Sequence, residues 1–323
     1  MRENVCMKII SDLENVKLKN AIITIGKFDG NHIGHQLLFD TIRKLKGDGD
    51  CTVVFTFNIP PAVMTESGQT DTIRTIQTHN ERYFSEDFAG IDYVVEFPFN
   101  KHTMAMEPES FVKEILVEKL GAKSIVVGED FCFGKDRKGN VDVLRELGAR
   151  FGFTVHALKK IAFQPEDFEK PVEVSSTLIK EEILRGNMED VRKMLGKPFS
   201  MTGEILHGKH VGSTIGFPTI NFAAPADKIL PPNGVYATRT IIDGQIYNSI
   251  TNVGKRPTFD DGEFRTVETN IFDFNEDVYG KTARVDFYRF IRPERKFASP
   301  KELMEEIDRN VQEVTAYFKD LHE

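Results

Sequence analysis

The sequence predicts an α/β domain built on a Rossmann-like parallel sheet, followed by a small antiparallel β-barrel that ends in a helix. In the first half, short β-branched and aromatic runs alternate with stretches of helical periodicity, which is the pattern of a parallel sheet covered by helices. In the second half, short strands and turns follow one another closely, as they do in small antiparallel barrels. These two observations also indicate two domains, which we place at residues 1–186 and 187–323.

The first half contains five expected strands, at Ala21–Ile25, Thr52–Phe57, Tyr93–Phe97, Ser124–Gly128 and Thr154–Leu158. Three stretches between or beside them have helical periodicity, at Gln36–Lys46, Pro108–Leu120 and Val141–Phe151. Parallel sheets bind ligands at the carboxyl ends of their strands. The segment directly after the first strand is therefore the first place to look for a site.

Two short helices are expected before the barrel, at Ser175–Arg185 and Asn187–Leu195. The barrel strands are expected at Gly234–Thr240, Gln245–Val253, Val267–Phe272 and Thr282–Ile291. The last helical stretch, Pro300–Leu321, follows Ser299 and has Glu302 at the third position, the pattern of a capping box. The second half thus ends in a helix.

Composition excludes several function classes. The net charge is -8 with no long basic run, which argues against a nucleic-acid partner. No apolar run reaches the ~20 residues of a membrane span, and the first residues lack the apolar core of a signal peptide. Three scattered cysteines support neither a disulfide framework nor a zinc site. We expect a cytoplasmic protein, either a monomer or a weak homo-oligomer, that acts on small molecules.

The stretch GKFDGNHIGH, residues 26–35, joins the first strand to a helix. His32 and His35 lack a third ligand of matching character, so a metal site is disfavoured, while buried core histidines remain an alternative. Gly26, Gly30 and Gly34 allow a ligand to approach the backbone closely, and the helix N-terminus favours an anion. Two imidazoles at such a place indicate a nucleoside triphosphate site.

This stretch resembles the G-x-F-D-G-x-H-x-G-H signature of the nucleotidyltransferase superfamily, in its flavin-nucleotide branch. The resemblance implies that His32 and His35 hold the phosphates of ATP and stabilise the transition state. It also implies that the other signature positions contact ATP, namely Gly26, Phe28, Asp29, Gly30 and Gly34.

Two further stretches match the same branch. VGEDFCFG, residues 127–134, carries Asp130, which could otherwise be a plain turn carboxylate. SSTLIK, residues 175–180, has a lysine where the branch has arginine, and its alternative interpretation is a helix N-cap. The resemblance assigns four residues of this stretch to ATP, namely Ser175, Ser176, Thr177 and Lys180.

The stretch GEILHGKHVGSTIGFPTIN, residues 203–221, repeats glycine every four residues. The glycines could simply form barrel turns, or they could form a flap whose backbone donors surround phosphate oxygens. Four residues of it are candidates for ATP binding, namely Gly208, Gly212, Gly216 and Pro218. Thr219 and Asn221 offer the oxygen ligands that Mg²⁺ prefers.

The second half resembles the riboflavin kinase family through PTIN, LPPNGVY, NVGKRPTF and VETNIFDF. The resemblance assigns Glu268 as the general base that takes a proton from the ribityl hydroxyl of riboflavin. On its own, Glu268 could be an exposed strand carboxylate. Asn252, Arg256 and Arg292 are the candidates for flavin binding.

Together the two halves resemble the bacterial bifunctional riboflavin kinase/FAD synthetase family. The resemblance implies two reactions, in which riboflavin and ATP give FMN, and FMN and ATP then give FAD and pyrophosphate. Three alternatives remain: a chain that kept one activity, a flavin-binding sensor without turnover, and a tRNA-synthetase-like enzyme, which the net charge disfavours.

Overall fold

The computed structural model describes residues 7–58, 62–64, 70–72, 74–83, 86–165, 169–206, 219–256 and 264–321. The chain forms two compact units. The first contains residues 1–73 and 82–175, and the second contains residues 74–81 and 176–323. The helix that begins at Ser176 thus belongs to the second unit, whereas the sequence divides the chain after residue 186. Where the two catalytic modules divide stays a prediction.

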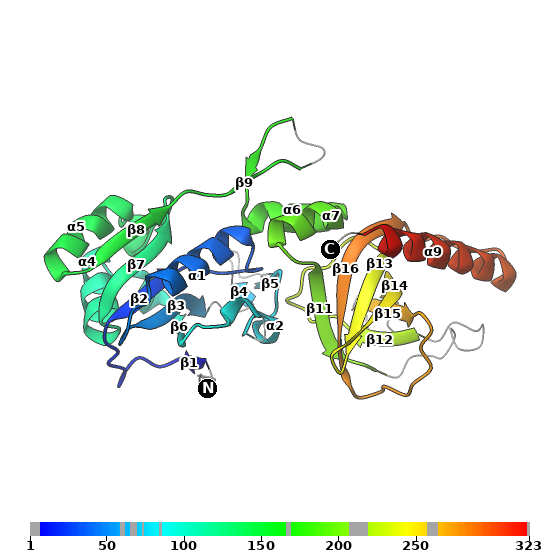
Figure 1. Ribbon diagram of the computed structural model, residues 1–323, viewed down its shortest axis with the longest axis horizontal. Helices are drawn as coiled ribbons and strands as arrows, with labels where there is room; N and C mark the ends of the chain where they lie inside the picture. Colours follow the sequence, from blue (N-terminus) through cyan, green and yellow to red (C-terminus); the bar gives the residue numbers. More distant parts are fainter. Residues whose placement is uncertain are drawn as a thin grey trace. The chain divides into compact units, whose positions relative to one another are not determined.

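The first unit is built on a six-stranded sheet in the order β1-β6-β3-β2-β7-β8, in which every neighbouring pair is parallel (Figure 1). The strands are β1 (Lys8–Ile10), β2 (Ala21–Ile25), β3 (Cys51–Asn58), β6 (Tyr93–Pro98), β7 (Ala122–Gly128) and β8 (Thr154–Leu158). The five strands expected from the sequence are all present. β1, a short edge strand, was not predicted.

Both faces of this sheet are covered by helices, because the buried side chains of each strand alternate between two cores. On β2, Ile22 packs with Phe39 and Ile42 of α1 (Ile33–Leu45). Ile23, which points the other way, belongs to the core of α5 (Val141–Phe151) and η2 (Phe111–Lys119). The first unit is therefore the three-layer α/β domain that the sequence predicts.

The strand order reverses direction beside β2. From β2 the chain moves outward through β3 and β6, and it then returns to β7 on the other side of β2. Such a switch point opens a crevice at the carboxyl ends of the two strands. The loop after β2 carries the two histidines, and the loop after β7 carries Asp130, so the predicted ATP residues of this unit follow the two switch-point strands.

The helix expected at Pro108–Leu120 differs from the prediction. A short α4 (Pro108–Ser110) continues as the π-helical η2, and the amide of Leu120 bonds to the carbonyl of Ile115, five residues back. π-Helical segments are rare and often lie near functional sites. The remaining short elements of this half are β4 (Ala62–Met64), β5 (Thr70–Thr72), α2 (His79–Tyr83), η1 (Glu86–Phe88), α3 (Lys101–Met104), η3 (Lys135–Arg137), β9 (Ala162–Phe163) and β10 (Val172–Glu173).

The second unit begins with α6 (Ser176–Arg185) and α7 (Met188–Leu195) and continues into an antiparallel sheet in the order β11-β16-β13-β14-β15-β12. The strands are β11 (Phe199–Glu204), β12 (Thr219–Ala223), β13 (Gly234–Ile242), β14 (Gln245–Arg256), β15 (Phe264–Ile271) and β16 (Thr282–Arg292). A bridge between Leu206 and Asn221 joins the two edges of the sheet. The sheet therefore curls into the predicted barrel.

The two faces of the barrel wall differ in chemistry. A ladder of buried hydroxyls crosses one face, with oxygen–oxygen distances of 2.8–2.9 Å among Thr238, Ser249, Thr251 and Thr269. On the other face, α9 (Pro300–Asp320) packs Val314 and Phe318 against Val235, Ala237 and Ile250 (Figure 1). Ser299 caps this helix by accepting a hydrogen bond from the amide of Glu302, as the sequence predicts.

A segment from the first half of the sequence is built into the second unit. Residues 74–81 pair with the chain before β13, where Thr75 forms a parallel bridge with Lys228. The ammonium of Lys228 is buried and lies 2.6 Å from a carboxylate oxygen of Glu81, and it also donates to the carbonyls of Ile76 and Ser200. This buried ion pair therefore connects residues 74–81 to the rest of the second unit.

We expect Lys228→Met to lower the free energy of unfolding of the second unit by about 3 kcal/mol, since it leaves the buried Glu81 carboxylate without its cation. Urea unfolding followed by circular dichroism measures the change. The control is Lys281→Met, which removes an exposed ion pair with Asp243 and should leave stability nearly unchanged, because solvent screens exposed ion pairs. Equal losses in the two variants would contradict the structural role of the buried pair.

No helix in the described part of the chain is both long and apolar enough to cross a bilayer.

Candidate active sites

The first candidate site is a pair of stacked imidazoles at the start of α1. His32 is the N-cap residue of this helix and His35 lies in its first turn. Their ring centroids are 3.6 Å apart with an interplanar angle of 21°, and the ring of Phe28 meets His35 edge-on at 5.1 Å. The backbone turn at the end of β2 thus brings the two predicted histidines together.

Both histidines are neutral at physiological pH. Burial lowers the pKa of His32 to about 4, although the nearby Asp29 carboxylate opposes the shift. Burial also lowers the pKa of His35 well below its usual value, and repulsion from a protonated His32 and from Arg82 acts in the same direction. A neutral imidazole has one N–H donor and one acceptor nitrogen, so the pair can bind phosphate oxygens through N–H groups.

The depressed pKa values predict a pH dependence of stability. An unfolded histidine takes up a proton below about pH 6.5, whereas His32 in the folded chain does so only near pH 4. Stability from His32 is therefore fully present above pH 6.5 and is lost as pH falls toward 4, by about 2–3 kcal/mol. Urea unfolding between pH 4 and 7.5 measures this, and the His32→Asn/His35→Asn variant should have a shallower slope. Parallel slopes would contradict the burial of neutral imidazoles.

The loop between β2 and α1 contains residues with positive φ angles, as its glycines suggest. Gly30 has φ 91°, and Phe28 and Asn31 also have positive φ, at 48° and 46°. Strained non-glycine residues of this kind tend to gather at ligand sites. A Cβ atom on Gly34 would lie 3.1 Å from the ring of His32, so glycine at this position leaves room for the stacked pair.

Several polar atoms in this loop are buried without a hydrogen-bond partner in the described part of the chain. They are Nδ1 of His32, Nδ1 of His35 and both amide atoms of Asn31. Because an unpaired buried polar group is costly, such atoms usually have a ligand or a water as partner. Asn31 was not among the residues predicted for the site. Its signal in the sequence is that it is the polar residue between Gly30 and His32 in the signature.

Asp130, after β7, is held in an ion-pair network. Lys160 lies 3.0 Å from its carboxylate and 2.8 Å from that of Glu173. Sequence reasoning missed Lys160 because it belongs to no motif. A Cβ atom on Gly128 would lie 3.0 Å from Oδ1 of Asp130, so the glycine of this stretch makes room for the carboxylate.

The stretch that carries four of the residues predicted to contact ATP spans the point in the sequence where the first unit ends and the second begins. Ser175 is the last residue of the first unit, while Ser176, Thr177 and Lys180 belong to α6 in the second. That these residues join the histidine pair stays a prediction.

The second candidate site is a row of side chains across the barrel wall. Strand pairing places Glu268 opposite Asn221 on one side and opposite Asn252 on the other. Asn252 in turn pairs with Val235, which pairs with Arg292. Directly opposed residues point to the same face of a sheet. Four predicted residues that are distant in sequence therefore share one row, on the face that carries α9.

Thr219 and Asn221 lie two residues apart on β12 and so point to the same face as Glu268. Asn270, opposite Thr219, extends this polar surface by one row. The described residues contain no group of three or more His, Cys, Asp or Glu that could hold a metal ion by itself. A cation here would need neutral oxygens of the protein together with oxygens of the substrate.

Arg292 is held by α9. Its Nε donates to the amide oxygen of Asn310 at 2.8 Å and lies 3.2 Å from a carboxylate oxygen of Glu306, and its guanidinium stands 5.6 Å from the ring centre of Phe297. Glu306 also pairs with Arg295 and Arg309. Glu306 and Asn310 were not predicted. Nothing in the sequence marks them except that both are polar residues on an amphipathic helix, and only the structure shows that they are buried.

Several predicted residues lie outside the described ranges. Gly208, Gly212, Gly216 and Pro218 belong to the undescribed stretch before β12. Arg256 ends β14, but its side chain is also outside the described part. Their roles stay predictions.

Comparison with known families matches both halves. The family model described as FAD synthetase matches residues 14–177, and the model described as riboflavin kinase matches residues 195–318. The two models thus fall, in the predicted order, on the stretches that carry the histidine pair and the Glu268 row.

Curated relatives match over nearly the full length. Proteins named bifunctional riboflavin kinase/FMN adenylyltransferase are 32% identical in Buchnera aphidicola subsp. Schizaphis graminum, covering 97% of this chain and 99% of the relative, and 32% identical in Bacillus subtilis, covering 93% of each. The protein of that name in Escherichia coli K12 is 31% identical, covering 96% of this chain and 97% of the relative.

A solved structure has the same fold. A chain from Streptococcus pneumoniae, titled a macrolide-efflux protein, is 31% identical with a TM-score of 0.83, and the match covers 95% of this chain and 97% of that one. The efflux function in that title is a statement about the Streptococcus pneumoniae protein and is not transferred to this chain. Two family models that together match most of the chain, and several near-full-length relatives, show that the chain belongs to the bifunctional riboflavin kinase/FMN adenylyltransferase family.

Proposed function

We propose that this chain phosphorylates riboflavin at the Glu268 row and adenylylates FMN at the histidine pair, so that it makes FAD from riboflavin and two molecules of ATP. The observation that carries the assignment is the row itself, because strand pairing aligns a carboxylate with two amides that are far apart in sequence. The substrates are ATP, riboflavin and FMN.

In the kinase reaction, the ribityl primary hydroxyl of riboflavin attacks the γ-phosphorus of ATP. A new oxygen–phosphorus bond forms, the bond from the γ-phosphorus to the bridging oxygen breaks, and ADP leaves. A primary alcohol is a poor nucleophile, and Glu268 is the group that accepts its proton. General bases of this kind contribute about 10²–10⁴-fold to the rate.

The oxygens of Thr219 and Asn221 suit a Mg²⁺ ion, which binds few protein ligands and completes its shell with water and phosphate oxygens. Such an ion would neutralise phosphate charge. Arg292, held by Glu306 and Asn310, is positioned at the end of the row next to α9. We assign it to the flavin side of the site, with Asn252 between it and Glu268.

In the adenylyltransferase reaction, a phosphate oxygen of FMN attacks the α-phosphorus of ATP and pyrophosphate leaves. The neutral His32 and His35 donate N–H groups to phosphate oxygens on which negative charge develops. They are preorganised by the stacking of their rings and by the burial of His32, so they need no rearrangement during the reaction. The amide of Asn31 is a third group that can bind a phosphate oxygen there.

The test is to incubate the full chain with riboflavin, ATP and Mg²⁺ and to separate the flavins by chromatography over time. We expect FMN to form first and FAD to follow. FMN without FAD would mean that only the kinase activity is present. Flavin binding without ATP consumption would contradict the enzyme proposal and support a flavin sensor.

A further inference from the structure

Arg82 is a basic side chain beside the histidine pair, and none of the short motifs of the first half contains it. It lies on α2, its side chain is partly buried, and it belongs to the first unit together with His32 and His35. Its positive charge is one of the causes that lower the pKa of His35, and a charge acts in this way at short range. The guanidinium of Arg82 and the imidazole of His35 are therefore neighbours.

The packing of α1 explains why Arg82 lies there. His35 and Phe39 are four residues apart and so lie on one face of this helix. Phe39 contacts Phe88 of η1, with ring centres 5.3 Å apart, and η1 begins four residues after Arg82. The chain between α2 and η1 therefore passes α1 on the face that carries His35.

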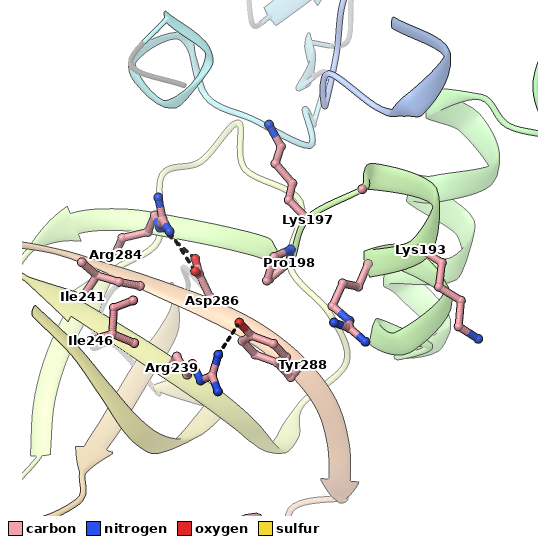
Figure 2. Close-up of a pocket in the computed structure, with 11 residues that line it drawn as sticks. Lys193, Lys197, Pro198, Arg239, Ile241, Ile246, Arg284, Asp286 and Tyr288 are labelled. Carbon is pink, nitrogen blue, oxygen red and sulfur yellow. Dashed lines mark hydrogen bonds and ion pairs between the residues drawn. The ribbon is translucent and has the colours of Figure 1, made fainter. Parts of the chain in front are cut away.

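The guanidinium of Arg82 has no partner in the part of the chain that the structure describes. Its Nε is buried without a hydrogen-bond acceptor, and no carboxylate of the described residues forms an ion pair with it. Other arginines are held by the protein, since Arg284 pairs with Asp286 at 2.9 Å and Arg239 donates to the hydroxyl of Tyr288 at 3.4 Å (Figure 2). A buried N–H donor without an acceptor is costly, so Nε of Arg82 indicates a ligand that accepts its hydrogen bond.

The charges around the histidine pair also favour a cation at this place. Both imidazoles are neutral, so they donate N–H groups to an anion but do not balance its charge. The carboxylate of Asp29 lies close enough to His32 to oppose the lowering of its pKa, and it adds a negative charge to the site. The basic residue of the loop, Lys27, is exposed. A triphosphate bound at the pair therefore requires a nearby positive charge, which Arg82 supplies.

We propose that Arg82 binds the triphosphate of ATP beside His35 and stabilises the negative charge of the leaving pyrophosphate. The proposal rests on the assignment of adenylyl transfer to the histidine pair. A phosphate oxygen of FMN forms a bond to the α-phosphorus, while the bond from the α-phosphorus to the bridging oxygen breaks and its electron pair stays with pyrophosphate. Arg82 neither gives nor takes a proton, and its planar guanidinium donates hydrogen bonds to the phosphate oxygens.

The first experiment compares Arg82→Gln and Arg82→Lys in the full chain, through initial rates of FAD formation from FMN, ATP and Mg²⁺. We expect Arg82→Gln to lower kcat at least about 10²-fold, the usual effect of losing one donor to a developing charge. Arg82→Lys keeps the charge but loses the planar fork, so it should be at least about tenfold faster than Arg82→Gln. FMN formation from riboflavin should be unchanged in both variants. A kcat of Arg82→Gln within about threefold of the wild-type value would overturn the proposal.

The reverse reaction separates a contact with phosphate from damage to the fold. In this direction pyrophosphate attacks FAD and gives ATP and FMN. We expect Arg82→Gln to raise the KM for pyrophosphate at least about tenfold, while the KM for FAD changes less than about threefold. Arg150→Gln removes an exposed arginine of α5 that pairs with Glu109, and it should leave both KM values unchanged. An equal rise of both KM values in Arg82→Gln would indicate a structural role and overturn the proposal.

A binding measurement tests Arg82 without turnover. ATP is titrated against the full chain by equilibrium dialysis, without flavin or Mg²⁺, and the binding that His32→Asn/His35→Asn abolishes is assigned to the histidine pair. Arg82→Gln should weaken this component at least about tenfold, whereas Arg150→Gln should not. If the wild type forms no FAD and the component still depends on Arg82, adenylyl transfer is wrong and the contact with triphosphate stands. An unchanged component in Arg82→Gln, or the absence of such a component in the wild type, would overturn the proposal even if FAD forms.

Discussion

Glu268→Gln should lower the rate of FMN formation by about 10²–10⁴-fold, the contribution expected of a general base. Glutamine keeps the size of the side chain and its place in the row, but it cannot take the proton of the ribityl hydroxyl. Since the loss lies in the chemical step, kcat should fall while the KM for ATP changes little. Initial rates with riboflavin and ATP, measured by chromatography of the flavins, test this expectation.

Two controls sharpen the Glu268 experiment. Glu204→Gln changes an exposed carboxylate at the end of β11 and should leave both reactions unchanged. When FMN is supplied, the Glu268→Gln variant should make FAD at the wild-type rate, because its adenylyltransferase site is intact. A variant that still makes FMN at the wild-type rate would show that Glu268 is not the base.

His32→Ala/His35→Ala should lower FAD formation from FMN by at least about 10²–10³-fold, the usual effect of removing one preorganised donor to a developing charge. FMN formation from riboflavin should be unchanged, so the variant should accumulate FMN. His32 is buried and His35 is partly buried, and thermal unfolding should therefore be measured with the rates to separate lost chemistry from lost structure.

His102→Ala provides the matched control for the histidine pair. His102 is an exposed histidine on α3 of the same unit, and its removal should leave both reactions intact. If the double variant folds normally and still forms FAD at the wild-type rate, the two histidines are core residues and the ATP site lies elsewhere. That outcome would revive the simpler interpretation of the pair as buried structural imidazoles.

The sequence predicted those helices, strands and turns that are determined by a short contiguous stretch of residues. Ala21–Ile25 is a buried β-branched run, and the strand predicted from it has the same bounds as β2. The sequence also predicted the capped helix after Ser299 and the loop of glycines and histidines after β2. Both predictions were possible because capping, periodicity and turn chemistry act over a few residues. β1 was missed because a three-residue strand depends on its neighbour β6 rather than on its own pattern.

Features that depend on distant partners could not be predicted. The segment Arg74–Glu81 belongs to the second unit, although it lies in the first half of the sequence, and its contacts with Lys228 and neighbouring residues of that unit show this. Two further features depend on which groups the fold buries together. They are the amide of Asn31, which has no hydrogen-bond partner among the described residues, and the ion pair of Arg292 with Glu306.

The sequence by itself determined the two chemistries of this protein, since the residue types and spacings of the His32 and Glu268 stretches are properties of contiguous chain. Only the tertiary structure decided how distant residues combine. Asn221, Asn252 and Glu268 share a row because β12, β14 and β15 pair in one register, and a shift of one residue would send each side chain to the other face. The contact between Arg192 and the ring of Tyr288 has the same origin, because the two residues meet only when α7 packs on β16.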